Sequence, residues 1–280
     1  PYYTTTSKIR LGVEKHIGES AVFRVDFQDS RLMGTGFFAD QNNVDILQGY
    51  VELKNVFNMP LSVQAGRFQM QYGTERIIGR SLWHYQERTF DGVRLKYSTE
   101  NFKFDWFQIA HTNSTPYMLK GMPSNYPYPA DDWDGYAMYG FWSAINAAQN
   151  HGFDLFGFVE DNGGTDMTRF TTGANYNGKF GKLKAVGEFA YQFGTQQKPT
   201  DEEDTEQDIA AYLASLKLIY NADPWKFHAG ADIISGTDPD GDGFGTYVNY
   251  PASKHKFLGL MDYFLVTTKG SGNLGVNDYY

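Results

Sequence analysis

The stretch Ala21–Gln28, which reads AVFRVDFQ, decides the class of fold. Apolar and polar residues alternate along it, so that Phe23 falls on one face and Arg24 and Asp26 fall on the other. A side-chain period of two is the pattern of a β-strand whose two faces have different surroundings. The same alternation recurs along the chain and predicts about 13 strands. The predicted strands cover residues 9–14, 21–28, 47–54, 61–70, 90–97, 102–106, 136–144, 153–160, 170–177, 183–193, 209–220, 225–233 and 258–266.

The connections between these strands are alternately short and long. Tight turns are predicted at residues 58–60, 99–100, 177–179 and 222–224, where Gly, Pro, Asn and Asp gather. The long segments are 30–43, 72–89, 112–135, 194–208 and 235–257. Short connections on one rim and long ones on the other are typical of an antiparallel up-and-down barrel that spans a membrane.

A soluble β-sandwich also shows alternation, so the two folds have to be distinguished. In a sandwich the inner faces of the strands form an apolar core, whereas here the polar face of nearly every strand carries charge. Aromatic residues also crowd the predicted strand ends, as they do at the two interfaces of a bilayer. These residues include Tyr97, Phe102, Tyr220 and Trp225. The sequence therefore favours an all-β transmembrane antiparallel barrel.

Composition excludes several other classes. The 280 residues include 17% aromatic residues, no Cys and a net charge of −9, and the mean hydropathy is −0.49. A chain without Cys has no disulfides or thiolate sites, and an acidic chain lacks the basic surface that nucleic-acid binding needs. No apolar run approaches the roughly 18 residues of a spanning helix. The chain opens at Pro1 without a leader sequence, so we expect a mature protein from which a signal peptide has been removed.

Two blocks of the sequence contain closely spaced motifs. The first runs from Asp45 to Leu95 and contains AGRFQMQYGTERIIG (residues 65–79), Trp83 and RTFDGVRL (residues 88–95). The second is HKFLGLMDYF (residues 255–264). Together these motifs resemble the alginate-export family of outer-membrane porins. The chain departs from the family's Gly-Arg-Gln order, because Phe68 stands between Arg67 and Gln69.

The resemblance implies a bacterial outer-membrane location and a barrel larger than the predicted strands would form. Family barrels have around 18 strands, as the resemblance implies. We therefore expect residues 1–280 to be a single barrel domain that belongs to a barrel of 14–18 strands and is incomplete at the C-terminus. Lipid bilayer and lipopolysaccharide are the expected surroundings, with periplasmic or surface proteins as further partners and no nucleic acid.

The candidate pore-lining residues are charged side chains that gather in the first block and on the second predicted strand. A guanidinium pairs bidentately with a carboxylate and stays charged inside a pore, so such residues can attract an anionic solute. They can equally form a structural ladder of ion pairs that stiffens the wall, and the two roles are compatible. The candidates are Arg24, Asp26, Arg67, Glu75, Arg76, Arg88, Asp91 and Arg94.

Arg67 poses a problem of side-chain direction. In a regular strand Arg67 would point to the same face as Leu61, Val63 and Ala65, which is the lipid-facing side. A charge there destabilises the fold by about 2–4 kcal/mol near the midplane of the bilayer. A bulge at Gly66 would switch the faces, and it predicts Arg67, Gln69 and Gln71 inside with Phe68 and Met70 outside. We further expect Arg67, Arg76 and Arg94 to lie near one another in the lumen.

The acidic segment DPDGDG (residues 238–243) resembles half of a calcium loop, with Asp238, Asp240 and Asp242 at alternate positions. A solvated acidic loop is the alternative, because the twelfth position is Asn249 rather than Glu. No other cofactor is expected. The sequence contains no G-x-S-x-G, P-loop, H-E-x-x-H or Rossmann motif, so we do not expect an enzyme.

The sequence thus predicts an outer-membrane channel that resembles alginate-export porins and passes anionic or polar solutes, such as polyuronates or oligosaccharides, through an arginine-lined lumen. The alternative is a non-conducting barrel that anchors or scaffolds a surface complex, with its lumen filled by ordered loops. The two differ in whether segments 72–89 and 112–135 fold into the lumen and seal it.

Overall fold

The described residues form one antiparallel sheet of 13 strands, in which every strand pairs with its neighbours in sequence. The computed structural model describes residues 5–33, 44–82, 87–111, 136–163, 166–198, 205–238, 240–248, 256–257 and 275–280. The strands are β1 Thr5–Ile17, β2 Ala21–Met33, β3 Val44–Leu53, β4 Leu61–Phe68, β5 Phe90–Ser98, β6 Phe102–His111, β7 Tyr136–Ala148, β8 His151–Asn162, β9 Met167–Phe180, β10 Leu183–Gln197, β11 Glu206–Ala222, β12 Trp225–Ile234 and β13 Val276–Tyr279. One 3₁₀ turn, η2, covers Val56–Asn58.

The up-and-down topology confirms the sequence prediction, with differences in detail. Twelve of the predicted segments lie on β1 to β12. The remaining one, residues 258–266, lies outside the described residues, and β13 was not predicted. The turn predicted at 177–179 is wrong, because β9 continues to Phe180 and the chain reverses at residues 181–182. Asn177 and Lys179 pair with Val186 and Lys184 of β10, so β9 runs three residues beyond the predicted strand end at 177.

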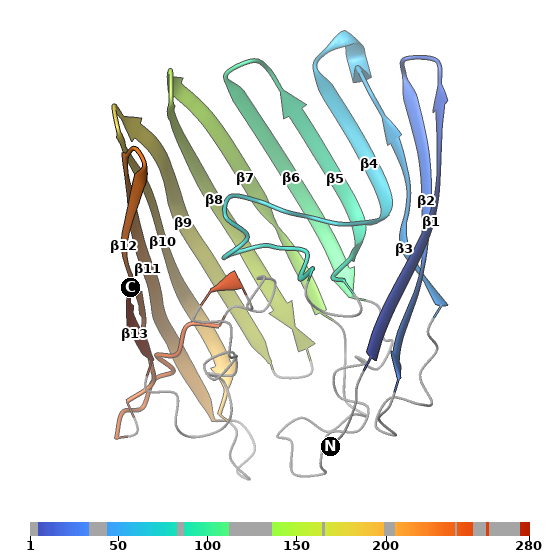
Figure 1. Cartoon of the computed structure of the whole chain (residues 1–280). Coiled ribbons are helices and arrows are strands. Elements are labelled where there is room, and N and C mark those ends of the chain that lie inside the picture. The colour runs from blue at the N-terminus through green and yellow to red at the C-terminus, as the bar shows by residue number, and fades with distance from the viewer. Residues whose placement is uncertain are drawn as a thin grey trace.

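The sheet curves around an interior (Figure 1), and its two rims differ. One rim, the short-turn rim at the top of Figure 1, joins β1–β2, β5–β6, β7–β8, β9–β10 and β11–β12 by brief turns. The opposite rim, the long-loop rim, carries the longer connections. Among the described strands, β1 pairs only with β2 and β13 only with β12. No helix in the described part of the chain is long and apolar enough to cross a membrane.

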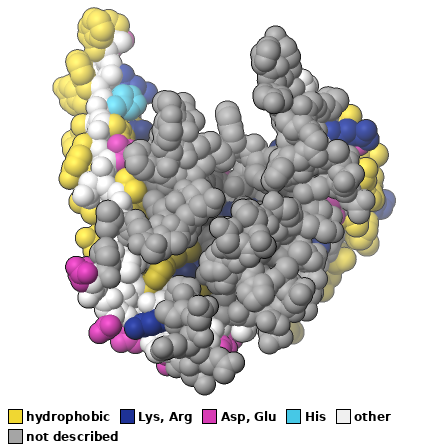
Figure 2. All heavy atoms as spheres, turned by 90° about the horizontal axis from the view of Figure 1, so that it is seen from below, with side chains coloured by type: hydrophobic (Ala, Val, Ile, Leu, Met, Phe, Trp, Pro, Cys, Tyr) yellow, Lys and Arg dark blue, Asp and Glu magenta, His cyan; other side chains and the backbone are white. Residues whose placement is uncertain are grey.

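The two faces of the sheet have the predicted chemistry. Phe23, Phe189 and Phe227 on the outer face are 43%, 50% and 58% exposed, whereas Glu188 on the inner face is buried. Figure 2, which looks at the long-loop rim, shows hydrophobic side chains on the outside of the wall at left, with basic side chains on its inner side. A wall that is apolar outside and charged inside fits lipid around a polar lumen.

The predicted bulge at Gly66 is wrong. β4 keeps a continuous register with both β3 and β5, and Gln64 and Phe68 are buried on the same inner face. Gly66 has a positive φ of 124°, and a Cβ there would collide with the Gly49 carbonyl oxygen. Close approach of two backbones therefore accounts for the glycine. Register shifts occur instead between Asp26 and Phe27 on β2 and between Asn146 and Ala148 on β7.

Candidate functional site

The connection between β4 and β5 enters the interior of the barrel. We call residues 69–89 the inner loop, of which the structure describes 69–82 and 87–89. In Figure 1 it leaves the end of β4, runs across the concave side of the sheet towards β8 and returns to β5. Its described residues contact three separate regions of the wall, and these contacts place it across the lumen.

Arg76 attaches the tip of the inner loop to the opposite wall. Its Nε donates to Glu188 Oε2 on β10 at 3.0 Å, and its Nη2 lies 3.1 Å from Asp232 Oδ2 on β12. The hydroxyl of Thr74 donates to the same Glu188 oxygen at 2.7 Å. The guanidinium also lies 4.0 Å from the ring centroid of Phe257. Because all three charged side chains are at most 5% exposed, the group is a closed structural latch rather than a free cation.

The return end of the inner loop is attached to the first strand. Glu87 accepts hydrogen bonds from Arg10 Nη2, from Lys8 Nζ at 3.3 Å and from Gln69 Nε2 at 2.9 Å. Arg10 in turn donates through Nε to Gln28 on β2 at 2.8 Å. The loop is therefore held to β1 at one end and to β10 and β12 at the other, by ion pairs at both.

The charge of Glu87 is favoured by these partners. Burial raises the pKa of its carboxyl, but hydrogen bonds from Gln69 and Arg10, together with the positive charges of Arg10 and Lys8, lower it by more. The net result is a pKa below the ordinary 4.5. Glu87 is therefore ionised at neutral pH, and its attachment to β1 depends on that ionisation.

An apolar layer lies beneath the inner loop. Ile77 and Ile78 are 2% and 0% exposed and belong to the same buried cluster as Phe68, Phe107 and Trp142 of the wall. The Tyr72 ring stacks on the Trp142 ring with centroids 5.0 Å apart. Burial raises the pKa of the Tyr72 phenol, which stays protonated and donates to Asp105 at 2.8 Å. The lumen is thus not polar throughout, because part of its wall packs against this loop.

This layer corrects the predicted directions of Phe68 and Met70, which were expected on the outside. Both are 0% exposed and lie in the interior cluster. An inner face that packs against a loop can be apolar, so the usual polar-inside rule does not apply at this point of the wall.

Three of the predicted residues lie on the inner face as expected. Arg24 donates to Asp26 at 2.9 Å and approaches Glu14 at 3.3 Å. Arg94 lies 3.8 Å from Asp105 Oδ2, and its guanidinium is 5.4 Å from the ring centroid of Phe68. These side chains combine ion pairing with a position on the lumen side of β2 and β5.

Arg67 and Asp91 lie on the outer face, contrary to the prediction. Arg67 follows Val63 and Ala65 in the regular alternation of β4, and Asp91 is its partner on β5. Arg67 donates to both oxygens of Asp91, at 2.8 and 2.9 Å, and approaches Asp45 at 3.4 Å. The pair sits at the strand ends beside the long-loop rim, away from the midplane where a charge in lipid is most unfavourable.

The arginines therefore do not form one cluster. Arg67 is outside, Arg94 is on the inner wall, and Arg76 reaches across to β10 and β12. Arg88 lies within the inner loop and donates to the Gly79 carbonyl at 3.3 Å. Glu75 accepts from Gln71 at 3.0 Å and from Lys256 at 3.2 Å. The arginines are close in sequence, but their segment folds into β4, the inner loop and β5, and these three elements carry them to different places.

Sequence reasoning missed a second buried ion pair. Arg169 on β9 donates to both oxygens of Glu160 on β8, each at 2.8 Å, and Tyr136 on β7 donates to the same carboxylate at 2.7 Å. Glu160 and Arg169 are cross-strand partners. The sequence does place opposite charges on the polar faces of these two consecutive strands. Without the pairing register of β8 and β9, however, it does not show that Glu160 and Arg169 lie opposite each other.

The described aspartates of the acidic segment contact protein groups. Asp238 accepts the backbone N–H of Asp240 at 3.0 Å, and Asp242 approaches Lys198 at 3.9 Å. Within the described ranges, no three His, Cys, Asp or Glu side chains converge on a point that could hold a metal ion. A calcium ion at Asp238, Asp240 and Asp242 stays a prediction.

Comparison with known proteins agrees with this architecture. The sequence model of a family described as alginate export matches residues 4–265. The chain belongs to the alginate export family. A search of curated proteins gave no significant match. The family match and the β-barrel fold indicate the bacterial outer membrane as the location of this member.

Solved structures from Pseudomonas aeruginosa share the fold of this alginate export family member. OpdL is 12% identical with a TM-score of 0.54, over 89% of this chain and 64% of OpdL. OccK8 (OprE) is 11% identical with a TM-score of 0.55, over 88% and 67%. The outer membrane protein OprD is 13% identical with a TM-score of 0.53, over 91% and 63%. The chain thus spans somewhat less than two thirds of the length of OpdL and OprD.

Proposed function

We propose that this protein is an outer-membrane channel for anionic or polar solutes, polyuronates and acidic oligosaccharides among them, and that the inner loop forms its constriction. The observation that carries the proposal is the attachment of the inner loop across the lumen, through Arg76 to Glu188 and Asp232 on one side and through Glu87 to Arg10 on the other. A fixed loop narrows the path, and it brings any passing solute against the charged wall.

The inner wall offers cationic groups beside that constriction. Arg24 and Lys96 face the lumen, each beside a carboxylate, and Lys96 lies 2.7 Å from Glu52. Arg94 is held more loosely, since its nearest carboxylate oxygen is 3.8 Å away. Its positive charge beside the constriction favours the approach of an anionic solute.

The direction of the barrel follows from its rims. Outer-membrane barrels have short periplasmic turns and longer extracellular loops. The short-turn rim therefore faces the periplasm in this proposal, and the inner loop enters the lumen from the extracellular side. Passage is passive, because the lumen wall supplies charged and polar groups but no energy source.

One observation favours the alternative of a non-conducting barrel. The inner loop and its apolar underside fill part of the lumen, as an anchoring barrel with an internal plug would require. Residues 72–82 and 87–89 do fold inwards, whereas segment 112–135 lies outside the described residues. A channel is therefore expected to pass ionic current through the reconstituted barrel, whereas an anchoring barrel is expected to pass none.

Reconstitution into planar bilayers tests the proposal directly. We expect discrete single-channel steps and, in a KCl gradient, a reversal potential of the sign set by anion preference. Barrels that insert and fold but give no steps under any applied voltage would overturn the channel function and favour the anchoring role. A reversal potential of the opposite sign would overturn the anionic solute class while leaving the channel intact.

A further inference from the structure

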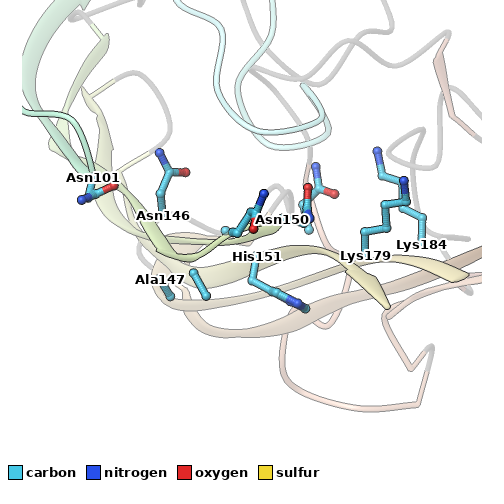
Figure 3. Close-up of a pocket in the computed structure, with 11 residues that line it drawn as sticks. Asn101, Asn146, Ala147, Asn150, His151, Lys179 and Lys184 are labelled. Atoms are coloured by element: carbon cyan, nitrogen blue, oxygen red, sulfur yellow. The ribbon is translucent and has the colours of Figure 1, made fainter. Parts of the chain in front are cut away.

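A pocket lies on the inner wall beside the short-turn rim, and its Lys184 is four residues along β10 from Glu188 of the Arg76 latch. It has a volume of about 690 Å³ and is formed by the turns and strand ends of β7 to β10. Figure 3 shows Asn146, Lys179 and Lys184 directed to one side of the sheet, whereas His151 points to the other. Its polar lining includes amides and basic groups, among them Asn101, Asn146, Asn150, Asn177, Lys179 and Lys184.

Two like charges face each other in this pocket. Lys179 on β9 and Lys184 on β10 are direct cross-strand partners, an arrangement that destabilises a sheet when nothing compensates it. Among the described residues, no Asp or Glu lines the pocket. Throughout the described residues, neither ammonium lies within 4.0 Å of a carboxylate, although most inner-wall arginines have such a partner.

The acidic side chains of the neighbouring wall are already engaged. Glu188 binds Arg76 and Thr74, and Asp154 on β8 accepts from the Trp142 indole at 3.1 Å. Arg24, Arg94 and Arg169 each lie beside a carboxylate of the wall. Lys179 and Lys184 therefore differ from these inner-wall cations. A bound anion would accept charge-assisted hydrogen bonds from both ammonium groups and reduce their mutual repulsion.

We propose that this pocket binds an oxyanion that carries hydroxyl groups, the chemistry of an acidic sugar, at the periplasmic mouth of the barrel. Lys179 and Lys184 bind the carboxylate, while the surrounding asparagine amides, which both donate and accept, bind the hydroxyls. The inference rests on the proposed function for the class of solute and for the orientation of the rim. In this proposal the pocket is a second solute-binding site, separate from the constriction at the inner loop.

Isothermal titration of the purified full chain in detergent, at one fixed salt concentration, tests the site with sodium glucuronate as the anionic probe and glucose as the uncharged one. We expect binding of glucuronate and none of glucose. The double variant Lys179→Gln/Lys184→Gln should raise the Kd for glucuronate at least about tenfold, because two charge-assisted contacts are lost. Circular dichroism checks that the variant keeps its β structure.

Lys15→Gln is the matched control. Lys15 sits near the same rim, but it pairs with Phe23 on the outer face of the sheet and has no carboxylate partner among the described residues. This variant should bind glucuronate like the parent. The proposal is overturned if the parent binds no glucuronate, if glucose binds equally well, or if the double variant retains the parent's Kd. It is also overturned if Lys15→Gln weakens binding as much as the double variant does.

The outcome is separable from that of the proposed function. A chain that conducts anions but binds glucuronate independently of Lys179 and Lys184 overturns this inference alone. A chain that gives no current yet binds glucuronate through the two lysines overturns the channel function alone.

Discussion

The Arg76 guanidinium and the Glu188 carboxylate meet at 3.0 Å although 112 positions separate them in the chain. Their contact joins a loop that leaves β4 to the wall formed by β10, and Asp232 of β12 completes the group at 3.1 Å. In a barrel wall, neighbouring strands are held by backbone hydrogen bonds. The latch instead holds a segment that belongs to no strand, so it determines whether the inner loop stays in the lumen.

Replacing Arg76 should release the loop. Arg76→Gln leaves two buried carboxylates without a cation, and breaking such a buried group destabilises by about 3–5 kcal/mol. We expect a lower thermal unfolding temperature and larger, noisier single-channel currents. The compensated variant Arg76→Met/Glu188→Gln/Asp232→Asn should recover most of the stability, since no unpaired charge remains. Equal currents in the parent and Arg76→Gln would argue against the loop as the constriction.

Ion selectivity should respond to the inner arginine and not to the outer one. Arg94→Gln removes a lumen-facing positive charge beside the inner loop, so the reversal potential in a KCl gradient should shift towards cation preference. Arg67→Gln removes the same charge from the outer face and serves as the control, with no expected shift. A shift of similar size in both variants would contradict the assignment of the two faces.

Acidification should loosen the return end of the inner loop. The pKa of Glu87 lies below its ordinary 4.5 in the folded protein. Its stabilising contribution is therefore fully present above about pH 4.5 and is lost as the pH falls through the lower folded pKa. Single-channel currents recorded from pH 7 down to pH 3 should become noisier below about pH 4.5. In Glu87→Gln that acid-dependent step should be absent, and its persistence would assign the step to another group.

A charge on the outer face should weaken folding into lipid far more than one on the inner face. Phe189→Arg places a charge in the apolar belt and should cost about 2–4 kcal/mol near the midplane. Val186→Arg, on the same strand but with inward parity, is the control and should cost much less. Urea titration of folding into phospholipid vesicles measures both. Comparable losses would mean that the outer face of β10 does not contact lipid.

Local alternation accounts for what could be predicted. The direction of a strand side chain depends on parity alone, so Phe23, Phe189 and Phe227 were correctly placed outside and Arg24 and Glu188 inside. The prediction around Gly66 was wrong because it assumed a bulge that turned Arg67 inwards and Phe68 and Met70 outwards, whereas the alternation stays regular along β4. The burial of Phe68 and Met70 depends on Ile77 and Ile78, which the sequence alone does not bring to the lumen.

Nearly all strands and their directions, the short and long rims, and the family could be predicted from the amino-acid sequence. These features follow from period-two patterning, turn residues and motifs that lie close together in the chain. The fold was needed to show which carboxylates hold Arg76, which face carries Arg67, and that Lys179 and Lys184 face each other. These facts depend on strand register and on a loop that packs across the lumen. Both depend on contacts between segments that are distant in the sequence, and the local pattern of residues does not predict such contacts.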